Sequence, residues 1–182
     1  MSKFELKPEE SVLVLIDFQE RLIPAVAQRD KVIKNANLLI QLADKLNVPV
    51  IITEQYPQGL GRTVPEINEN LAGCKLVEKV KFSAMVPELQ EVLGALGRKK
   101  IVIAGTETHI CVFQTVRDLV EAGFTVHVVQ DAVGSRFEEN YQSGLELMRD
   151  LGAVITNTET VIFDMLKVAG TPVFREMSKL LK

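Results

Sequence analysis

The apolar run Val12-Leu13-Val14-Leu15-Ile16, followed directly by Asp17, decides the fold. Its residues do not alternate with polar ones, which is typical of a strand buried on both faces of a parallel sheet. Later runs of the same character lie at residues 50–53, 101–104, 126–129 and 153–156. The sequence therefore predicts a mostly parallel β-sheet that is covered by helices on both faces.

Amphipathic segments alternate with these runs. Apolar residues recur in them at helical spacing, and Gly123 and Gly152 follow two of them as stop signals. These segments lie at residues 32–43, 89–96, 112–120, 136–151, 160–168 and 172–181. The alternation predicts an α/β fold, a three-layer α/β/α sandwich around a doubly wound, Rossmann-like sheet, with residues 1–182 as one domain.

The composition excludes several classes of protein. Of the 182 residues, 47% are hydrophobic and 25% are charged, which is too apolar for a disordered chain. A net charge of −3 gives no basic surplus for a phosphate backbone, so we expect no nucleic acid partner. The apolar runs are too short to span a bilayer, and the charged start MSKFELKPEE has no signal-peptide core. We expect a cytoplasmic protein without membrane contact.

The two cysteines, Cys74 and Cys111, are too few for a four-cysteine zinc site or a disulfide scaffold. Cys111 stands where the predicted strand 101–104 gives way to a helix. The N-terminus of a helix has N–H donors and a partial positive charge, which favour a thiolate and an oxyanion. The alternative is a small buried residue between strand and helix. Cys74 has no acidic partner in the sequence, and we expect it to be inert.

Polar residues gather where the predicted strands end, which is where open parallel sheets bind ligands. They are Asp17, residues 53–55, residues 105–107 and Asp131. Asp17 could be the base for a thiol or could cap a turn. Either Lys79 or Lys81 could supply a cation, because alternation in an extended chain sends both to one face. A solvated surface charge is the alternative for both lysines.

Nucleotide-binding signatures are missing from the sequence. The turn after the first strand, Asp-Phe-Gln-Glu-Arg at 17–21, is bulky where a dinucleotide fold has glycines. The sequence contains neither a Walker-type loop nor a nucleophile elbow. The one long irregular segment, 54–73, is rich in proline and glycine, and loops of that length are often functional.

Three blocks of the sequence together resemble the catalytic blocks of the isochorismatase-like cysteine hydrolases. They are VLIDFQ at 14–19, KVKFSA at 79–84 and GTETHICV at 105–112, and the likeness extends to TEQYP at 53–57 and DAVGSR at 131–136. The resemblance covers nearly the whole chain. The most similar subgroup is that of small isochorismatase-domain proteins of undefined substrate.

The resemblance implies a catalytic triad of Asp17, Lys79 and Cys111. Lys79 is selected over Lys81 because the family's lysine stands three positions before an aromatic residue. The resemblance also implies a cis peptide bond between Thr106 and Glu107. The backbone N–H groups of Glu107 and Cys111 would form the oxyanion hole.

The implied chemistry is hydrolysis through a thioester. Asp17 would accept the thiol proton, Cys111 would attack a carbonyl carbon, and Lys79 would stabilise the negative charges. Nicotinamidases of the superfamily hold a metal through histidines after the second strand, and residues 53–57 contain none, so no metal and no cofactor are implied. The named isochorismatases lack the cysteine, which favours C–N hydrolysis of a small amide here. Family members usually assemble, so we expect a homo-oligomer.

Five residues are candidates for lining a substrate pocket because of their positions in the sequence alone, although structural packing explains each of them equally well. They are Gln19, Gln55, Tyr56, Phe82 and Thr108. Two other functions stay open. Cys111 and Arg117 fit the Cys-x5-Arg pattern of cysteine phosphatases, but the residues between them are bulkier than in a phosphate-binding loop. The chain could also be a catalytically silent family member that acts as an interaction scaffold.

Overall fold

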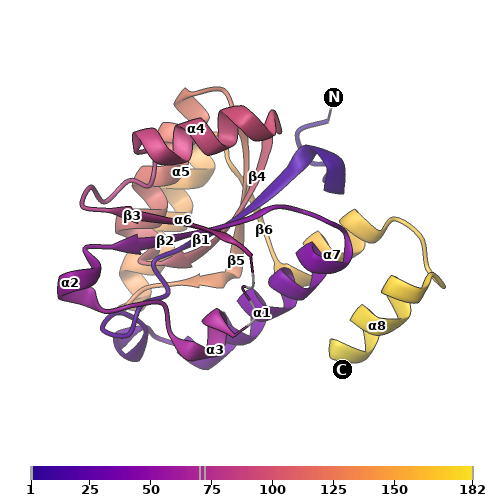
Figure 1. Ribbon diagram of the computed structural model, residues 1–182, viewed down its shortest axis with the longest axis horizontal. Coiled ribbons are helices and arrows are strands. Elements are labelled where there is room, and N and C mark those ends of the chain that lie inside the picture. Colours follow the sequence, from indigo (N-terminus) through magenta and orange to yellow (C-terminus); the bar gives the residue numbers. More distant parts are fainter. Residues whose placement is uncertain (1, 70, 72, 182) are drawn as a thin grey trace.

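The fold is built on one all-parallel sheet (Figure 1). The computed structural model describes residues 2–69, 71 and 73–181, and across these six strands pair in the order β3-β2-β1-β4-β5-β6. They are β1 (Ser11–Ile16), β2 (Val50–Gln55), β3 (Lys75–Lys79), β4 (Lys100–Thr106), β5 (Thr125–Gly134) and β6 (Val154–Thr156). The strand order reverses beside β1, which is where open sheets bind ligands.

Helices cover both faces of the sheet, so the predicted three-layer, doubly wound architecture is confirmed (Figure 1). One face packs against α1 (Arg29–Lys45) and α7 (Thr158–Leu166), and α8 (Pro172–Leu180) packs on these two helices. The other packs against α4 (Pro87–Leu96), α5 (Phe113–Glu121) and α6 (Glu138–Asp150). Leu13 and Leu15 of β1 enter the first core and Val12, Val14 and Ile16 enter the second. Burial of both faces is why this run carries no polar residue.

Short elements lie around the main ones. They are η1 (Pro8–Glu10), η2 (Ile23–Ala25), α2 (Pro57–Leu60), α3 (Pro65–Asn68) and the π-helical turn η3 (Thr108–Val112). The predicted helix at 112–120 thus begins as a π-helical turn before α5 takes over. No helix of the described residues is long and apolar enough to cross a membrane.

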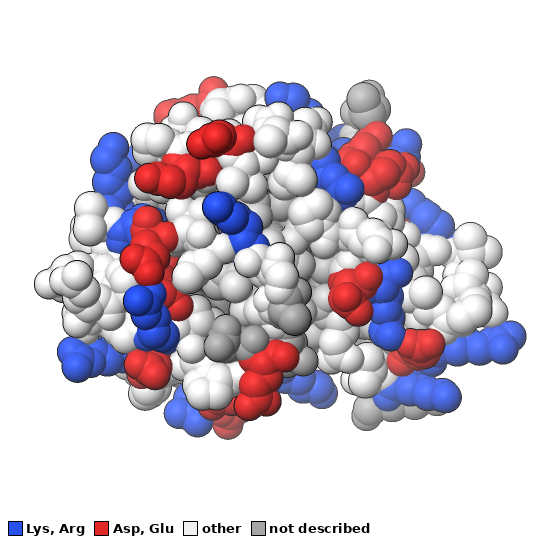
Figure 2. All heavy atoms as spheres, viewed as in Figure 1, with Lys and Arg blue, Asp and Glu red and all other residues white. Residues whose placement is uncertain are grey.

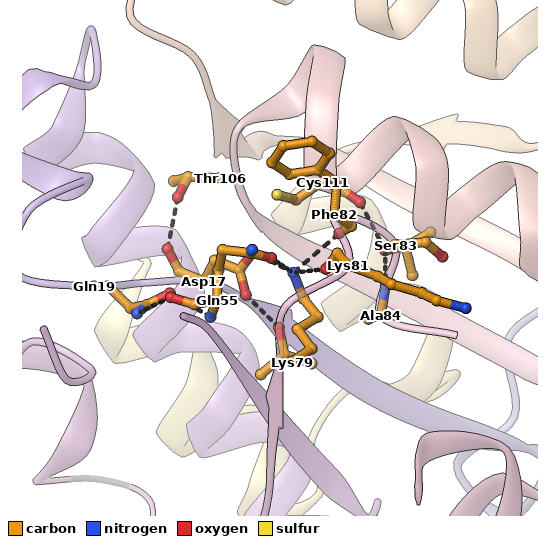
Figure 3. Close-up of polar contacts among 12 residues, drawn as sticks. Asp17, Gln19, Gln55, Lys79, Lys81, Phe82, Ser83, Ala84, Thr106 and Cys111 are labelled. Atoms are coloured by element: carbon orange, nitrogen blue, oxygen red, sulfur yellow. Dashed lines mark hydrogen bonds and ion pairs between the residues drawn. The ribbon is translucent and has the colours of Figure 1, made fainter. Parts of the chain in front are cut away.

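The strand β3 was not predicted, because it is an edge strand on which only Val77 and Lys79 are buried. The strand ends at Lys79, so Lys79 and Lys81 do not share a strand face as alternation suggested. Lys79 is buried and Lys81 is exposed. From this edge strand the side chain of Lys79 points inward, so that its ammonium lies beside Asp17 (Figure 3).

Two polar residues that the sequence analysis placed at strand ends, Asp131 and Glu54, serve the fold and are not among the pocket residues. Asp131 does not end its strand, because β5 runs on to Gly134, and its carboxylate accepts two 2.8 Å hydrogen bonds from Thr158 at the start of α7. Glu54 accepts hydrogen bonds from Thr63 and Arg62. Burial opposes its ionisation, but these hydrogen bonds outweigh burial and lower the pKa of Glu54. The loop around Arg62 and Thr63 is thereby tied to the sheet.

Candidate active site

Asp17 is held in one position by hydrogen bonds from several strands. It follows β1 in a left-handed backbone conformation (φ 53°), its side chain is fully buried, and its N–H donates to the Thr53 carbonyl. One carboxylate oxygen accepts from Thr53 Oγ1 at 2.6 Å. The other accepts from Lys79 Nζ at 2.8 Å (Figure 3). The Asp17 carbonyl accepts from Thr106 Oγ1 at 2.7 Å. Groups from β2, β3 and β4 therefore hold this one residue.

Lys79 forms a buried ion pair with Asp17, in which neither side chain is exposed. Its ammonium also lies 2.7 Å from Gln55 Oε1, 2.9 Å from the Phe82 carbonyl and 3.3 Å from the Lys81 carbonyl. An ammonium has three donors, and four acceptors surround this one (Figure 3). Lys79 therefore has no donor to spare for a ligand unless it gives up a bond within the protein.

Cys111 lies in η3, beyond the end of β4. The chain reaches it through Gly105, whose φ is 145°, and a cis Thr106–Glu107 peptide bond, as the sequence resemblance implied. A Cβ on Gly105 would lie 2.3 Å from the Ile16 carbonyl oxygen, so only glycine lets the end of β4 approach β1 this closely. Cys111 therefore lies beside Asp17, and a hydrogen bond joins their side chains.

The Cys111 thiol is protonated at rest. Burial, together with the negative charge of Asp17, raises the pKa of Cys111 to about 12 against the opposing charge of Lys79. The helix N-terminus therefore does not leave the thiol ionised in the resting protein, because burial and the carboxylate outweigh its effect. A base must remove the proton during any reaction, and Asp17 is placed to be that base.

Thr115 connects the two halves of the site, and no role for it was predicted from the sequence. Its hydroxyl donates to the Cys111 carbonyl at 2.6 Å and accepts from the Ala84 N–H at 2.8 Å. Ala84 closes the loop whose carbonyls, at Lys81 and Phe82, hold Lys79. A threonine four positions after a helical residue can bond back to its carbonyl, which is the signal that could have identified it.

A pocket of about 360 Å³ opens above Cys111. Its lining includes four residues that the sequence had placed in the site, namely Gln55, Phe82, Glu107 and Cys111. It also includes six that the sequence had not: Arg21, Leu22, Ala25, Leu60, Ile110 and Arg136. The missed residues come from loops and short helices that no periodic pattern marks. This volume suits a small molecule.

Three of the predicted pocket residues are not among those that line this pocket. The Gln19 side chain is fully buried and bonds the backbone of Gln55 and the Gly61 carbonyl, so it braces the loop. Thr108 is also fully buried. The exposed Tyr56 directly precedes α2, and its ring lies close to Gly59. Gln19 therefore has a structural role beside the pocket rather than a place in its wall.

The residues of the other sequence motifs lie apart from the pocket. The Arg117 guanidinium pairs with Asp118 at 2.8 Å on the surface of α5 and is not among the pocket residues, so it does not support a phosphatase loop. Cys74 is half-buried beside α1 and is likewise outside the pocket. Among the described residues, no three His, Cys, Asp or Glu side chains gather as they would around a metal ion.

Comparison with known proteins defines the family. The model of the isochorismatase domain matches residues 11–160, and the chain therefore belongs to the isochorismatase family and has its hydrolase fold. The secreted isochorismatase effector Isc1 of Phytophthora sojae is 43% identical over 182 residues, covering 97% of this chain and 87% of that protein.

Two solved structures extend the likeness. The MAR1 ribonuclease of Caenorhabditis elegans superposes with a TM-score of 0.92 at 36% identity, covering 97% of this chain and 92% of that one. The YcaC gene product of Escherichia coli, described as an octameric hydrolase of unknown specificity, superposes with a TM-score of 0.87 at 27% identity, covering 97% and 87%. These relatives share the fold and differ in the activities that their names give.

Proposed function

We propose that the protein is a cysteine hydrolase that cleaves the C–N bond of a small amide, with Cys111 as nucleophile and Asp17 as general acid and base. One observation carries the proposal. The Cys111 thiol lies at a small pocket and bonds to a carboxylate whose position is fixed by Lys79 and Thr53. Nucleophile, base and the group that orients the base are thus in contact, as covalent catalysis requires.

The acylation step moves one proton and exchanges one bond. As Cys111 Sγ attacks the carbonyl carbon, its proton passes to Asp17, and the carbonyl oxygen becomes an oxyanion. The N–H groups of Glu107 and Cys111 receive that oxyanion, and each such donor is worth roughly 10²–10³ in rate. The C–N bond then breaks, Asp17 returns the proton to the leaving nitrogen, and a thioester remains on Cys111.

Deacylation repeats the sequence with water. Asp17 takes a proton from the attacking water, the second oxyanion collapses, and the acid leaves while the Cys111 thiolate takes the proton back. Lys79 acts through Asp17 throughout, because its donors are occupied within the protein. It holds the carboxylate in place and keeps the buried pair neutral overall. We therefore propose Lys79 as a positioning residue.

The test is ammonia release from a panel of small primary amides by the wild-type protein and two variants. Cys111→Ala should lower turnover of any accepted amide by at least about 10³-fold, because the covalent route is lost. Its far-ultraviolet circular dichroism should match the wild type. Cys74→Ala is the matched control and should keep full activity, since Cys74 lies outside the pocket. Full activity of Cys111→Ala would exclude the proposed nucleophile, and it would equally exclude a silent scaffold.

RNA is a second substrate to test, because the Caenorhabditis elegans structural neighbour is named a ribonuclease. On the face shown in Figure 2, basic and acidic side chains are interspersed, and the whole chain carries a net charge of −3. A phosphate backbone binds best to a continuous basic surface. We therefore expect no RNA cleavage above that of the Cys111→Ala variant under conditions in which the wild type hydrolyses an amide.

We further propose that the chain acts as a single domain within a homo-oligomer, as the octameric YcaC neighbour suggests. Light scattering coupled to size-exclusion chromatography gives the number of subunits. A cytoplasmic location belongs to the same proposal, and the secreted relative from Phytophthora sojae makes fractionation of the source cells the informative measurement.

A further inference from the structure

The mouth of the pocket holds two arginines that the proposed chemistry does not use, Arg21 and Arg136. Arg136 follows β5, and its side chain is 49% exposed. Its Nε lies 2.6 Å from Glu107 Oε1. Arg21 donates from Nη1 to the Gly59 carbonyl at 2.8 Å. A guanidinium has five N–H donors, so each arginine is oriented by one contact and has donors left for a ligand.

The fixed charges of the pocket leave a surplus of one positive charge. Among the described residues that line it, Arg21 and Arg136 are cationic and Glu107 is the single acid. The adjacent Asp17–Lys79 pair is neutral overall. The whole chain, by contrast, carries −3, so the positive charge is a local property of this mouth. Low-dielectric walls strengthen such a local charge.

Apart from Gln55, the remaining walls are hydrocarbon. Apolar side chains from four segments complete the pocket between the arginines and Cys111: Leu22, Ala25, Leu60, Phe82 and Ile110. A ligand that fits these walls has an apolar middle, a carbonyl at the cysteine and a negative group at the mouth. A single surplus charge matches a carboxylate better than a phosphate, which carries about −1.5 to −2 near neutral pH.

We propose that the substrate is a monoamide of a short dicarboxylic acid, whose free carboxylate is bound by Arg21 and Arg136 while its amide carbon meets Cys111. The planar fork of a guanidinium suits a carboxylate. Glu107 fixes the orientation of Arg136 and prevents the mouth from attracting dianions. This assignment rests on the proposed function, because it takes Cys111 as the reacting atom.

Iodoacetate and iodoacetamide test the charge of the mouth without requiring any turnover. The two reagents have similar size and the same leaving group, and they differ by one negative charge. The rate ratio of iodoacetate to iodoacetamide at Cys111, measured by peptide mass spectrometry, should fall about three- to tenfold in Arg21→Gln and in Arg136→Gln. In the wild type, 1 M NaCl should lower the ratio as well. Arg117→Gln, which removes an arginine outside the pocket, should leave the ratio unchanged.

Additional variants control for the possibility that a substitution prevents folding. Arg136→Gln leaves the buried Glu107 without its cation, so Arg136→Lys is included, and it should keep most of the wild-type ratio. Arg21→Gln removes only a bond to a carbonyl and tests the proposal alone if Arg136→Gln does not fold. A matching pair of substrates follows: succinamate should be hydrolysed with a higher kcat/KM than the neutral succinamide, and Arg21→Gln should reduce that preference.

The outcomes separate this proposal from the one on which it rests. A ratio that is the same in wild type, Arg21→Gln and Arg136→Gln would overturn the carboxylate assignment and leave Cys111 as a reactive thiol. Failure of both reagents to modify Cys111 even at high pH, while Cys74 reacts, would instead overturn the nucleophile and the carboxylate assignment with it.

Discussion

Asp17 holds its backbone in a conformation that a non-glycine residue seldom adopts, with φ at 53°. Such a conformation costs on the order of 1–3 kcal/mol and persists only where the surroundings enforce it. Here the surroundings are Thr53, Lys79 and Thr106, which bond both carboxylate oxygens and the carbonyl. The result is a carboxylate that is aimed at Cys111 and cannot rotate away.

Replacing Asp17 by asparagine should change two readouts in opposite directions. Hydrolysis should fall by about 10²–10⁴-fold, because asparagine cannot accept or return the proton. Alkylation of Cys111 at pH 8 should become faster, because loss of the negative charge lowers the raised pKa of the thiol while Lys79 remains beside it. Ammonia release and the rate of iodoacetamide modification, measured across pH 7–11, check both parts.

Thr53→Val is the control for the Asp17→Asn variant. It removes one hydrogen bond to Asp17 and keeps the charge, so hydrolysis should fall with little change in the alkylation profile. Slower alkylation in Asp17→Asn at every pH would contradict the assigned electrostatics and would point to Asp17 as a base for alkylation too.

At the scale of residues, the sequence predicted which side chains meet better than it predicted the pKa of the Cys111 thiol. Asp17, Lys79 and Cys111 come together as the resemblance implied, and Lys79 rather than Lys81 turns inward. The raised pKa of the Cys111 thiol was not predictable, because it depends on how deeply Cys111 is buried and on a carboxylate 94 positions earlier in the chain. Arg21 and Arg136 carry no local pattern, and only the fold brings them to one pocket.

At the scale of elements, the site depends on how η3 is joined to the loop after β3. Thr115 makes this connection through the Ala84 N–H and the Cys111 carbonyl. Thr115→Val keeps the shape and removes both bonds, which should cost about 1–3 kcal/mol of folding free energy, because a buried N–H is left unpaired. The same change should lower kcat about tenfold with little change in KM, because Cys111 loses its fixed position and the pocket walls stay.

Thr115→Ser supplies the control. Serine keeps the hydroxyl, so kcat should recover most of its wild-type value, although the lost methyl group lowers stability. The pH dependence of Cys111 alkylation is a readout that a purely structural role would not move. An unchanged alkylation profile and an unchanged kcat in Thr115→Val would show that the connection serves the fold alone.

Strands that are buried on both faces were predicted from the sequence, and the strand that is buried on one face was missed. β1, β2 and β4 are nearly fully buried and appear in the sequence as continuous apolar runs. β3 buries only alternate residues at the sheet edge, so it carries no such run, although it delivers Lys79. β5 runs beyond its apolar part to Gly134 because the pairing with β4 shifts register near Ile103.

At the scale of the whole molecule, His127 makes stability depend on pH. It lies on β5 and is only 1% exposed, and burial, with help from the charge of Lys100, lowers its pKa from 6.5 to about 4. The unfolded chain therefore binds a proton between pH 6.5 and 4 that the folded chain does not bind. Folding stability falls as pH drops through this window, by up to about 3 kcal/mol from this residue.

His127→Gln should flatten this dependence. Urea unfolding at pH 7.5 and pH 4.5 gives the loss of stability for each protein, and the variant should lose about 2 kcal/mol less than the wild type over that interval. Carboxylates titrate in both proteins, so the difference between them isolates the histidine. Equal losses would mean that His127 is protonated without penalty in the folded state.

Apart from Gln55, which lines the pocket and accepts a hydrogen bond from Lys79, the pocket walls and the groups that hold Asp17 are separate sets of residues. Thr53, Lys79 and Thr106 hold Asp17 from neighbouring strands, whereas the hydrocarbon walls come from η2, α2, η3 and the loop after β3. A substitution in one set leaves the hydrogen bonds of the other intact. Evolution can therefore reshape what the pocket accepts while inheriting the reactive centre unchanged, which gives one scaffold a way to diversify by gene duplication.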